Sequence, residues 1–216
     1  MLGQNRDLPR AGGGCRATGN PVMKWTLPNI LTLLRIVLIP VLVVVYYLPG
    51  KWIPLLSAAV FGLAAVTDWL DGYLARRLKQ QSVFGAFLDP VADKLMVAIA
   101  LVLLVATNHN VFFSIPVAVI IGREIAVSAL REWMSQIGER ATVAVSIIGK
   151  IKTTAQMIAI LLLLYDLPVA GYPIHGLGII LLYVAAVLTL WSMVIYLRAA
   201  WPLLSGNPAD SGGQAA

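Results

Sequence analysis

Four aspartates lie close together in the sequence, on either side of a short polar turn. They are Asp68, Asp71, Asp89 and Asp93, and apolar residues flank the segment on both sides. On helices the two pairs are spaced i, i+3 and i, i+4, so each pair projects from one face. An ionised aspartate near hydrocarbon costs about 2.5 to 3.5 kcal/mol on insertion scales. Four of them therefore need cations, and oxygen ligands favour hard divalent ions.

Small residues accompany these acids on the same helix faces. Gly72 and Ala75 follow Asp68 at i+4 and i+7, and Gly85 precedes Asp89 by four. This spacing leaves room for a ligand or another backbone beside the carboxylates. Two Mg²⁺ or Mn²⁺ ions bridged by the four carboxylates would clamp the attacking and leaving oxygens of a phosphoryl displacement. The alternative is that some of these aspartates are solvated residues of the polar turn.

The composition indicates a membrane protein. Of the 216 residues, 59% are hydrophobic and 12% are charged, and the mean hydropathy is +0.84. Both values lie outside the usual range of soluble domains. The net charge of +6 is dispersed among apolar segments and forms no stripe with aromatic residues, so we expect no nucleic-acid partner. Anionic membrane lipids and phosphate groups are the partners that we predict.

Six apolar segments are each long enough to cross a bilayer, since a span needs about 20 residues. We therefore predict an all-α integral membrane fold in which residues 23–204 form one six-helix domain, with a short interfacial helix at 22–29. Residues 1–22 and 205–216 are polar and glycine-rich, and they are predicted to be disordered tails. The predicted spans are 30–47, 53–70, 84–106, 111–130, 143–164 and 176–197.

The basic residues predict the orientation. Of the sixteen Lys and Arg residues, Lys51 alone falls in the first, third or fifth loop. By the positive-inside rule, both termini are therefore cytoplasmic. The acidic and basic residues within the spans cluster at the same end, which predicts a polar pocket that opens to the cytoplasm.

A second charged group lies in the fourth and fifth spans. Arg and Lys recognise phosphate well, so this group is predicted to bind the phosphate of an anionic acceptor. Alternatively, Arg123 or Arg131 pairs with Glu124 or Glu132, or the lysines reach lipid headgroups. The group consists of Arg123, Arg131, Lys150 and Lys152.

The aspartate segment resembles a known family. It fits without a departure the pattern D-x2-D-G-x2-A-R-x8-G-x3-D-x3-D of the CDP-alcohol phosphatidyltransferases, from Asp68 to Asp93. Within that family, the segments PNILTLLR, IGREIAVSALREWM and AVSIIGKIKTTAQM, at 28–35, 121–134 and 144–157, resemble the bacterial phosphatidylglycerophosphate synthases. The resemblance covers nearly everything except the two tails.

The resemblance implies a homodimeric enzyme of the bacterial inner membrane. It implies transfer of a phosphatidyl group from CDP-diacylglycerol to an alcohol, here sn-glycerol 3-phosphate, with release of CMP. By position, Asp68, Asp71, Asp89 and Asp93 would be metal ligands, and Asp93 would also be the catalytic base. The residues that would line the CDP site are Gly72, Ala75, Arg76, Gly85, Asn29, Thr32 and Arg35.

Other functions stay open at this point. Within the family, the acceptor could be inositol phosphate, serine or phosphatidylglycerol. Intramembrane prenyltransferases also bind Mg²⁺ with aspartate motifs on helices, but they release pyrophosphate. A divalent-cation transporter would place acids through the midplane and at both ends, and this distribution is absent from the sequence.

Overall fold

The structure, a computed structural model, describes residues 27–78, 83–108, 110–136, 147–168 and 174–204. Within these ranges it consists of helices joined by short turns, with no strand, which confirms the predicted all-α class. The predicted tails, and residues 22–26 of the predicted interfacial helix, lie outside the described residues. The helices are α1 Leu27–Tyr47, α2 Ile53–Leu78, α3 Val83–Thr107, α4 Val111–Gln136, α5 Ile147–Tyr165 and α6 Ile174–Leu204.

The helices agree with the predicted apolar segments at the end that carries the short loops. At the opposite end, α2, α4 and α6 each continue for six or more residues past the predicted limit. The prediction stopped where charged residues begin. A helix does not stop there, because charge interrupts the apolar pattern without breaking the backbone hydrogen bonds.

Five of the described helices are long and apolar enough to cross a membrane: α1, α2, α3, α4 and α6. In the part of α5 whose side chains the structure describes, the apolar stretch is Ile151–Tyr165, and it includes Lys152. In three of the spanning helices a proline lies in the helix interior, away from the terminal turns, at Pro40, Pro90 and Pro116. Membrane helices tolerate proline because neighbouring groups satisfy the freed backbone.

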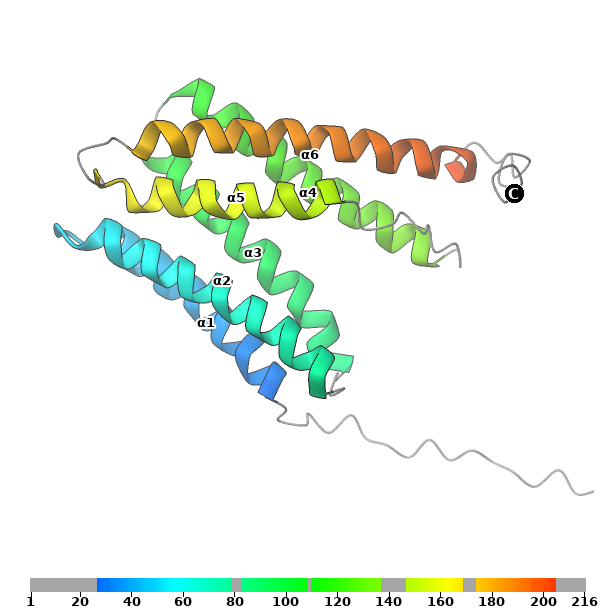
Figure 1. Cartoon of the computed structure of the whole chain (residues 1–216), viewed down its shortest axis with the longest axis horizontal. Helices are drawn as coiled ribbons and strands as arrows, with labels where there is room; N and C mark the ends of the chain where they lie inside the picture. The colour runs from blue at the N-terminus through cyan, green and yellow to red at the C-terminus, as the bar shows by residue number, and fades with distance from the viewer. Residues whose placement is uncertain (1–26, 79–82, 109, 137–146, 169–173, 205–216) are drawn as a thin grey trace, which may run out of the picture.

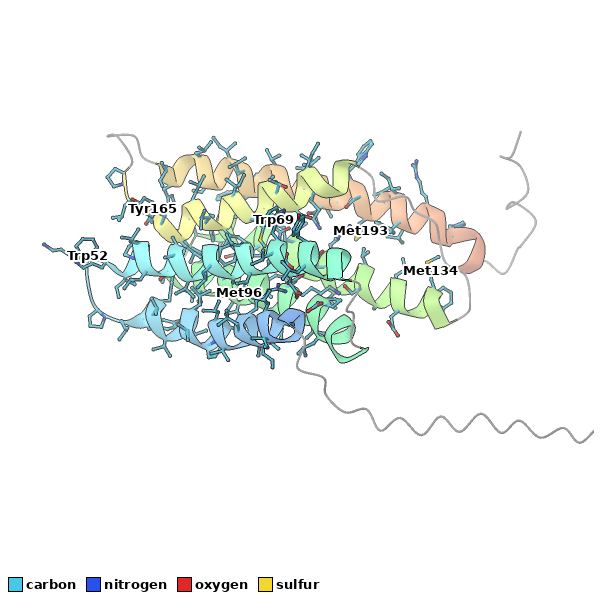
Figure 2. All side chains as sticks on the ribbon, turned by 60° about the horizontal axis from the view of Figure 1, so that its bottom comes forward. Trp52, Trp69, Met96, Met134, Tyr165 and Met193 are labelled. Carbon is cyan, nitrogen blue, oxygen red and sulfur yellow. The ribbon has the colours of Figure 1, made fainter. Side chains whose placement is uncertain are left out.

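The bundle consists of two packed groups. Helix α1 packs along α2 and α3, and α6 packs along α5 and α4. Figure 1 shows α3 running obliquely between the α1–α2 pair and the α5–α6 pair. Contacts between α2 and α5 also join the two groups. In Figure 2, Trp52 and Tyr165 lie at the end that carries the short loops, and Met134 lies towards the other end.

Burial in this fold follows the pattern of a membrane protein. The apolar core includes Leu42, Phe61, Leu101, Ile160 and Leu182. Large apolar side chains also cover the outside, and Val37, Val66 and Val187 are among the most exposed. In contrast, Thr32, Arg35, Asp71, Arg123, Lys152, Gln156 and Ser192 are buried. The lipid-facing surface is therefore apolar, and the polar groups point inward.

Polar contacts fasten the loop end of the bundle. The Tyr46 and Thr107 hydroxyls lie 2.8 Å apart and join α1 to α3. The Tyr183 hydroxyl donates to the Phe112 carbonyl at 2.6 Å and joins α6 to α4. After α5, Asp166 adopts a left-handed conformation with φ 40°, and its carboxylate lies 2.7 Å from Nδ1 of His175. These contacts hold the ends of the helices that position the site at the opposite end.

Candidate active site

The four aspartates of the sequence motif converge on two residues of α1. Arg35 and Thr32 lie one turn apart on that helix, and both are buried against α2 and α3. Asp68 and Asp71 come from the second half of α2, and Asp89 and Asp93 come from the first half of α3. We call these six residues the acidic centre.

The acidic centre has two layers. In the first, the Arg35 guanidinium bonds Asp93 through Nη1, and its Nη2 lies 3.2 Å from Oδ1 of Asp68. The second contact has ion-pair distance but lacks hydrogen-bond geometry. Arg35 is only 2% exposed, whereas the side chains of Asp68 and Asp93 are 43% and 40% exposed, so water screens these ion pairs in part.

In the second layer, the Thr32 hydroxyl contacts Asp71 at 3.1 Å and also contacts Asp89. A hydroxyl carries a single proton, so it donates to one of these carboxylates at a time. Oδ1 of Asp71 is buried and has no hydrogen-bond partner among the described residues. A buried carboxylate oxygen without a partner is costly.

The oxygen-only donor set of the acidic centre fits a hard cation. Four carboxylates face one guanidinium, which leaves a formal excess of three negative charges, and the buried Oδ1 of Asp71 adds an unmatched ligand atom. In the part of the chain that the structure describes, however, no three acidic, His or Cys side chains surround a common point. Arg35 and Thr32 instead stand between the paired aspartates.

A cavity of about 240 Å³ opens beside the acidic centre. Asp68 and Asp93 form one wall, and Glu124 and Gln156 form the opposite wall, from α4 and α5. Lys94 and Pro90 of α3 also line it. Towards the apolar core, Phe61, Met96 and Met157 border Arg35 and the two acids. Two of the motif aspartates, Asp68 and Asp93, therefore face a space in which a polar ligand can reach both of them and helix α4.

Of the four residues predicted to bind the acceptor phosphate, the structure describes the side chains of Arg123 and Lys152. Arg123 donates from Nη1 to Oε2 of Glu124 at 2.9 Å, and Lys152 Nζ lies 3.2 Å from the same oxygen. From α6, the Ser192 hydroxyl accepts from Arg123 Nη2 at 2.7 Å, and the Tyr196 ring lies 6.0 Å from the guanidinium carbon. The alternative pairing of Arg123 with Glu124 is therefore present. We call Arg123, Glu124 and Lys152 the basic triad.

For several predicted site residues the structure describes the backbone and leaves the side chain undescribed. Their backbones are helical, but their side chains lie outside the described part of the structure, so their roles stay predictions. These residues are Asn29, Ala75, Arg76, Arg131 and Lys150. Gly72 lies on α2 directly after Asp71, and Gly85 lies in the first turn of α3.

Sequence reasoning did not identify every residue that completes the site. Ser192 and Gln156 are uncharged, and their positions in apolar helices carry no distinctive spacing. Lys94 follows Asp93 directly in the sequence, and this position next to the motif could have indicated that it lines the cavity. Only the packing of α6 against α4 shows that Ser192 contacts a residue 69 positions away.

Comparison with known proteins decides the family. The sequence model of the CDP-alcohol phosphatidyltransferases matches residues 25–191, which include all six helices except the end of α6. The chain belongs to this family. The match spans the acidic centre, the cavity and most of the basic triad's surroundings, so this CDP-alcohol phosphatidyltransferase is a transferase of phospholipid biosynthesis with several membrane-spanning helices.

Individual members of the family are similar along almost their whole length. Proteins of Sodalis glossinidius, Pectobacterium atrosepticum and Shigella flexneri are 58%, 56% and 54% identical to it over 178 residues. In each case the similarity covers 82% of this chain and 96% of the relative. All three are named CDP-diacylglycerol–glycerol-3-phosphate 3-phosphatidyltransferase. Membership of the family rules out the prenyltransferase and transporter alternatives.

Proposed function

We propose that this enzyme transfers the phosphatidyl group of CDP-diacylglycerol to sn-glycerol 3-phosphate and releases CMP. The observation that carries the proposal is the convergence of all four motif aspartates on Thr32 and Arg35, beside a cavity that reaches the basic triad. The names of the relatives support the choice of donor and acceptor.

We propose that Asp68, Asp71, Asp89 and Asp93 hold two Mg²⁺ or Mn²⁺ ions. Bound there, the ions would neutralise the pyrophosphate of the donor and stabilise charge on the oxygens around the reacting phosphorus. The excess negative charge of the acidic centre and the unpartnered Oδ1 of Asp71 support this assignment. Arg35 positions Asp68 and Asp93 by its two contacts.

Asp93 is the candidate general base, because it lies on the cavity wall and its side chain is 40% exposed. It accepts the proton of the acceptor hydroxyl, and the resulting oxygen attacks the phosphorus that bears diacylglycerol. A new P–O bond forms while the bond to CMP breaks. This single displacement needs no covalent enzyme intermediate. Thr32, Arg35, Gly72, Ala75, Arg76, Asn29 and Gly85 are proposed to surround the CDP group.

The acceptor phosphate is proposed to bind on the opposite side of the cavity, at Arg123 and Lys152, with Lys150 and Arg131 contributing. An Arg123→Ala variant should raise the KM for glycerol 3-phosphate about tenfold or more, since a charge-assisted contact is lost. The KM for CDP-diacylglycerol should change much less. Equal effects on both KM values would contradict this placement.

One assay tests the reaction. Purified protein is incubated with CDP-diacylglycerol, glycerol 3-phosphate and Mg²⁺, and CMP and the lipid product are both followed. We expect equal amounts of CMP and phosphatidylglycerophosphate. Parallel reactions contain serine, inositol phosphate or phosphatidylglycerol as acceptor. Turnover with one of these and none with glycerol 3-phosphate would overturn the acceptor, and absence of CMP in every reaction would overturn the transfer itself.

The proposal also includes a location. The bacterial relatives and the spanning helices support the inner membrane, and the distribution of Lys and Arg supports cytoplasmic termini and a cytoplasmic active site. A homodimer is expected from the family resemblance. Cross-linking in native membranes measures the assembly state.

A further inference from the structure

Glu124 stands between the cavity and the two cations of the basic triad. Its Oε2 contacts Arg123 Nη1 at 2.9 Å and Lys152 Nζ at 3.2 Å. The Glu124 side chain is 32% exposed, whereas those of Arg123 and Lys152 are 7% and 6% exposed. Glu124 also lines the cavity, and neither cation is among the lining residues. An anion in the cavity, where Lys94 also lies on the wall, therefore meets the Glu124 carboxylate before it meets Arg123 or Lys152.

The contacts of Arg123 limit which of its nitrogen atoms can bond an incoming phosphate. Ser192 holds Nη2 from α6, and the Tyr196 ring lies nearby, so the guanidinium is fixed from behind. Only the edge that carries Nη1 faces Glu124. An incoming phosphate can bond this edge if the Glu124 carboxylate moves away, because both anions need the same donors.

We propose that Glu124 is a specificity-determining residue of the acceptor pocket, and that the acceptor phosphate binds by replacing its carboxylate on Arg123 and Lys152. This inference rests on the proposed function and goes beyond it. When the ligand displaces the Glu124 carboxylate, the ion pairs of Glu124 with Arg123 and Lys152 are broken. Only an anion with several strong acceptor oxygens forms new contacts with both cations that compensate for this loss. A phosphate monoester dianion brings more negative charge and more acceptor oxygens than the Glu124 carboxylate that it displaces, whereas the carboxylate of serine brings no more than Glu124 already supplies. Glu124 thereby selects phosphorylated acceptors.

The proposal predicts that removing the charge of Glu124 strengthens phosphate binding. Glu124→Gln keeps the side-chain shape and changes the formal charge of the basic triad from +1 to +2. Inorganic phosphate is the probe, and its apparent Kd comes from the phosphate-dependent thermal unfolding midpoint of the full-length protein in lipid nanodiscs. We expect the Kd to fall about tenfold, because a competing negative charge next to both cations is removed. The KM for CDP-diacylglycerol should stay within about twofold.

Two controls make the charge argument specific. Asp166→Asn is the matched variant, since Asp166 follows α5 at the loop end, away from the cavity, and its side chain is 55% exposed; its phosphate Kd should equal that of the unchanged protein. The double variant Glu124→Gln/Lys152→Gln returns the formal charge to +1, so its Kd should return to within about threefold of the original value.

Other results would overturn the proposal. If Glu124→Gln leaves the phosphate Kd unchanged or raises it, Glu124 supports the cations and does not compete for them. If that variant fails to fold, Glu124→Asp keeps the charge and shortens the reach, and we expect a Kd about threefold lower. An unchanged or higher Kd there contradicts the inference. Phosphate binding needs no turnover, so failure here is distinct from failure of the proposed reaction, which the CMP assay detects.

Discussion

At the scale of single residues, Arg35 and Asp93 connect the stability of the bundle with its chemistry. Arg35 is buried between α1, α2 and α3, and its two ion pairs satisfy one aspartate on each of the other two helices. Asp93 is partly exposed to the cavity and shares that guanidinium. A substitution of Asp93 should therefore lower turnover, and a substitution of Arg35 should lower the thermal unfolding midpoint.

The Asp93→Asn substitution tests the general base. The amide keeps the shape of the carboxylate but cannot accept the proton, so we expect kcat to fall about 10²- to 10⁴-fold. Turnover is measured by CMP release at increasing Mg²⁺, and added Mg²⁺ should not restore it. Asp166→Asn is the matched control at the loop end, where asparagine also tolerates the left-handed backbone. Near-normal turnover of Asp93→Asn would refute the assignment.

The Arg35→Gln substitution tests what neutralises the aspartates. Removing one partner of a fully buried ion pair typically costs about 3 to 5 kcal/mol; Asp68 and Asp93 are partly exposed, so we expect a smaller loss, seen as a lower thermal unfolding midpoint in the absence of divalent ions. If the aspartates bind cations, millimolar Mg²⁺ should recover at least half of the loss, because the ions replace the missing positive charge. Arg198→Gln, at an exposed arginine of α6, should show neither effect. A loss that Mg²⁺ does not change would contradict the metal assignment.

The sequence predicted the acidic centre more completely than the basic triad, for a physical reason. Four aspartates at helical spacing stand out in apolar segments, and Thr32 and Arg35 followed from the family resemblance. The pairing of Glu124 with both Arg123 and Lys152 depends on how α4 packs on α5. Spacing within one helix does not determine which residue of another helix it meets.

At the scale of the helices, the same reasoning explains which boundaries were predicted. The apolar pattern located all six described helices and their ends at the loop side. It missed the ends of α2, α4 and α6, because charged residues interrupt the apolar pattern there while the helix continues. The pattern also did not show which face of α6 packs against α5, where Gly178 lies against Leu163.

Gly178 of α6 lies directly against Leu163 of α5. A Cβ atom at this position would meet Leu163 Cγ at 2.9 Å and Cδ2 at 3.0 Å, so the side chain or helix must shift. Overpacking costs about 1 to 3 kcal/mol, which exceeds the roughly 1 kcal/mol gained in helix propensity. We therefore expect Gly178→Ala to lower the thermal unfolding midpoint.

A matched glycine on α2 provides the control. A Cβ atom at Gly62 would lie 3.6 Å from Leu161 Cδ1, an ordinary van der Waals contact. Gly62→Ala should therefore leave the midpoint unchanged or raise it slightly. Equal midpoints for Gly178→Ala and Gly62→Ala would show that the α5–α6 contact is looser than the structure indicates.

At the scale of the whole molecule, polarity is distributed unevenly along the bundle. Of the buried charged residues, Arg35, Asp71 and Lys152 lie in the halves of α1, α2 and α5 away from the short loops, and Arg123 lies at the middle of α4. The core between them and the loops is apolar. Charged substrates can therefore enter from one end, while the surrounding surface suits lipid chains.

The orientation can be tested with thiols on opposite ends of the bundle. Cys15 is the only cysteine and precedes α1, and Lys51 lies in the loop between α1 and α2. In the unchanged protein, a membrane-impermeant maleimide should label Cys15 only after spheroplasts are lysed, because the positive-inside rule places that end in the cytoplasm. In a Cys15→Ser/Lys51→Cys variant, labelling should occur in intact spheroplasts. The reverse pattern would invert the proposed topology and place the acidic centre on the wrong side for a cytoplasmic nucleotide-linked substrate.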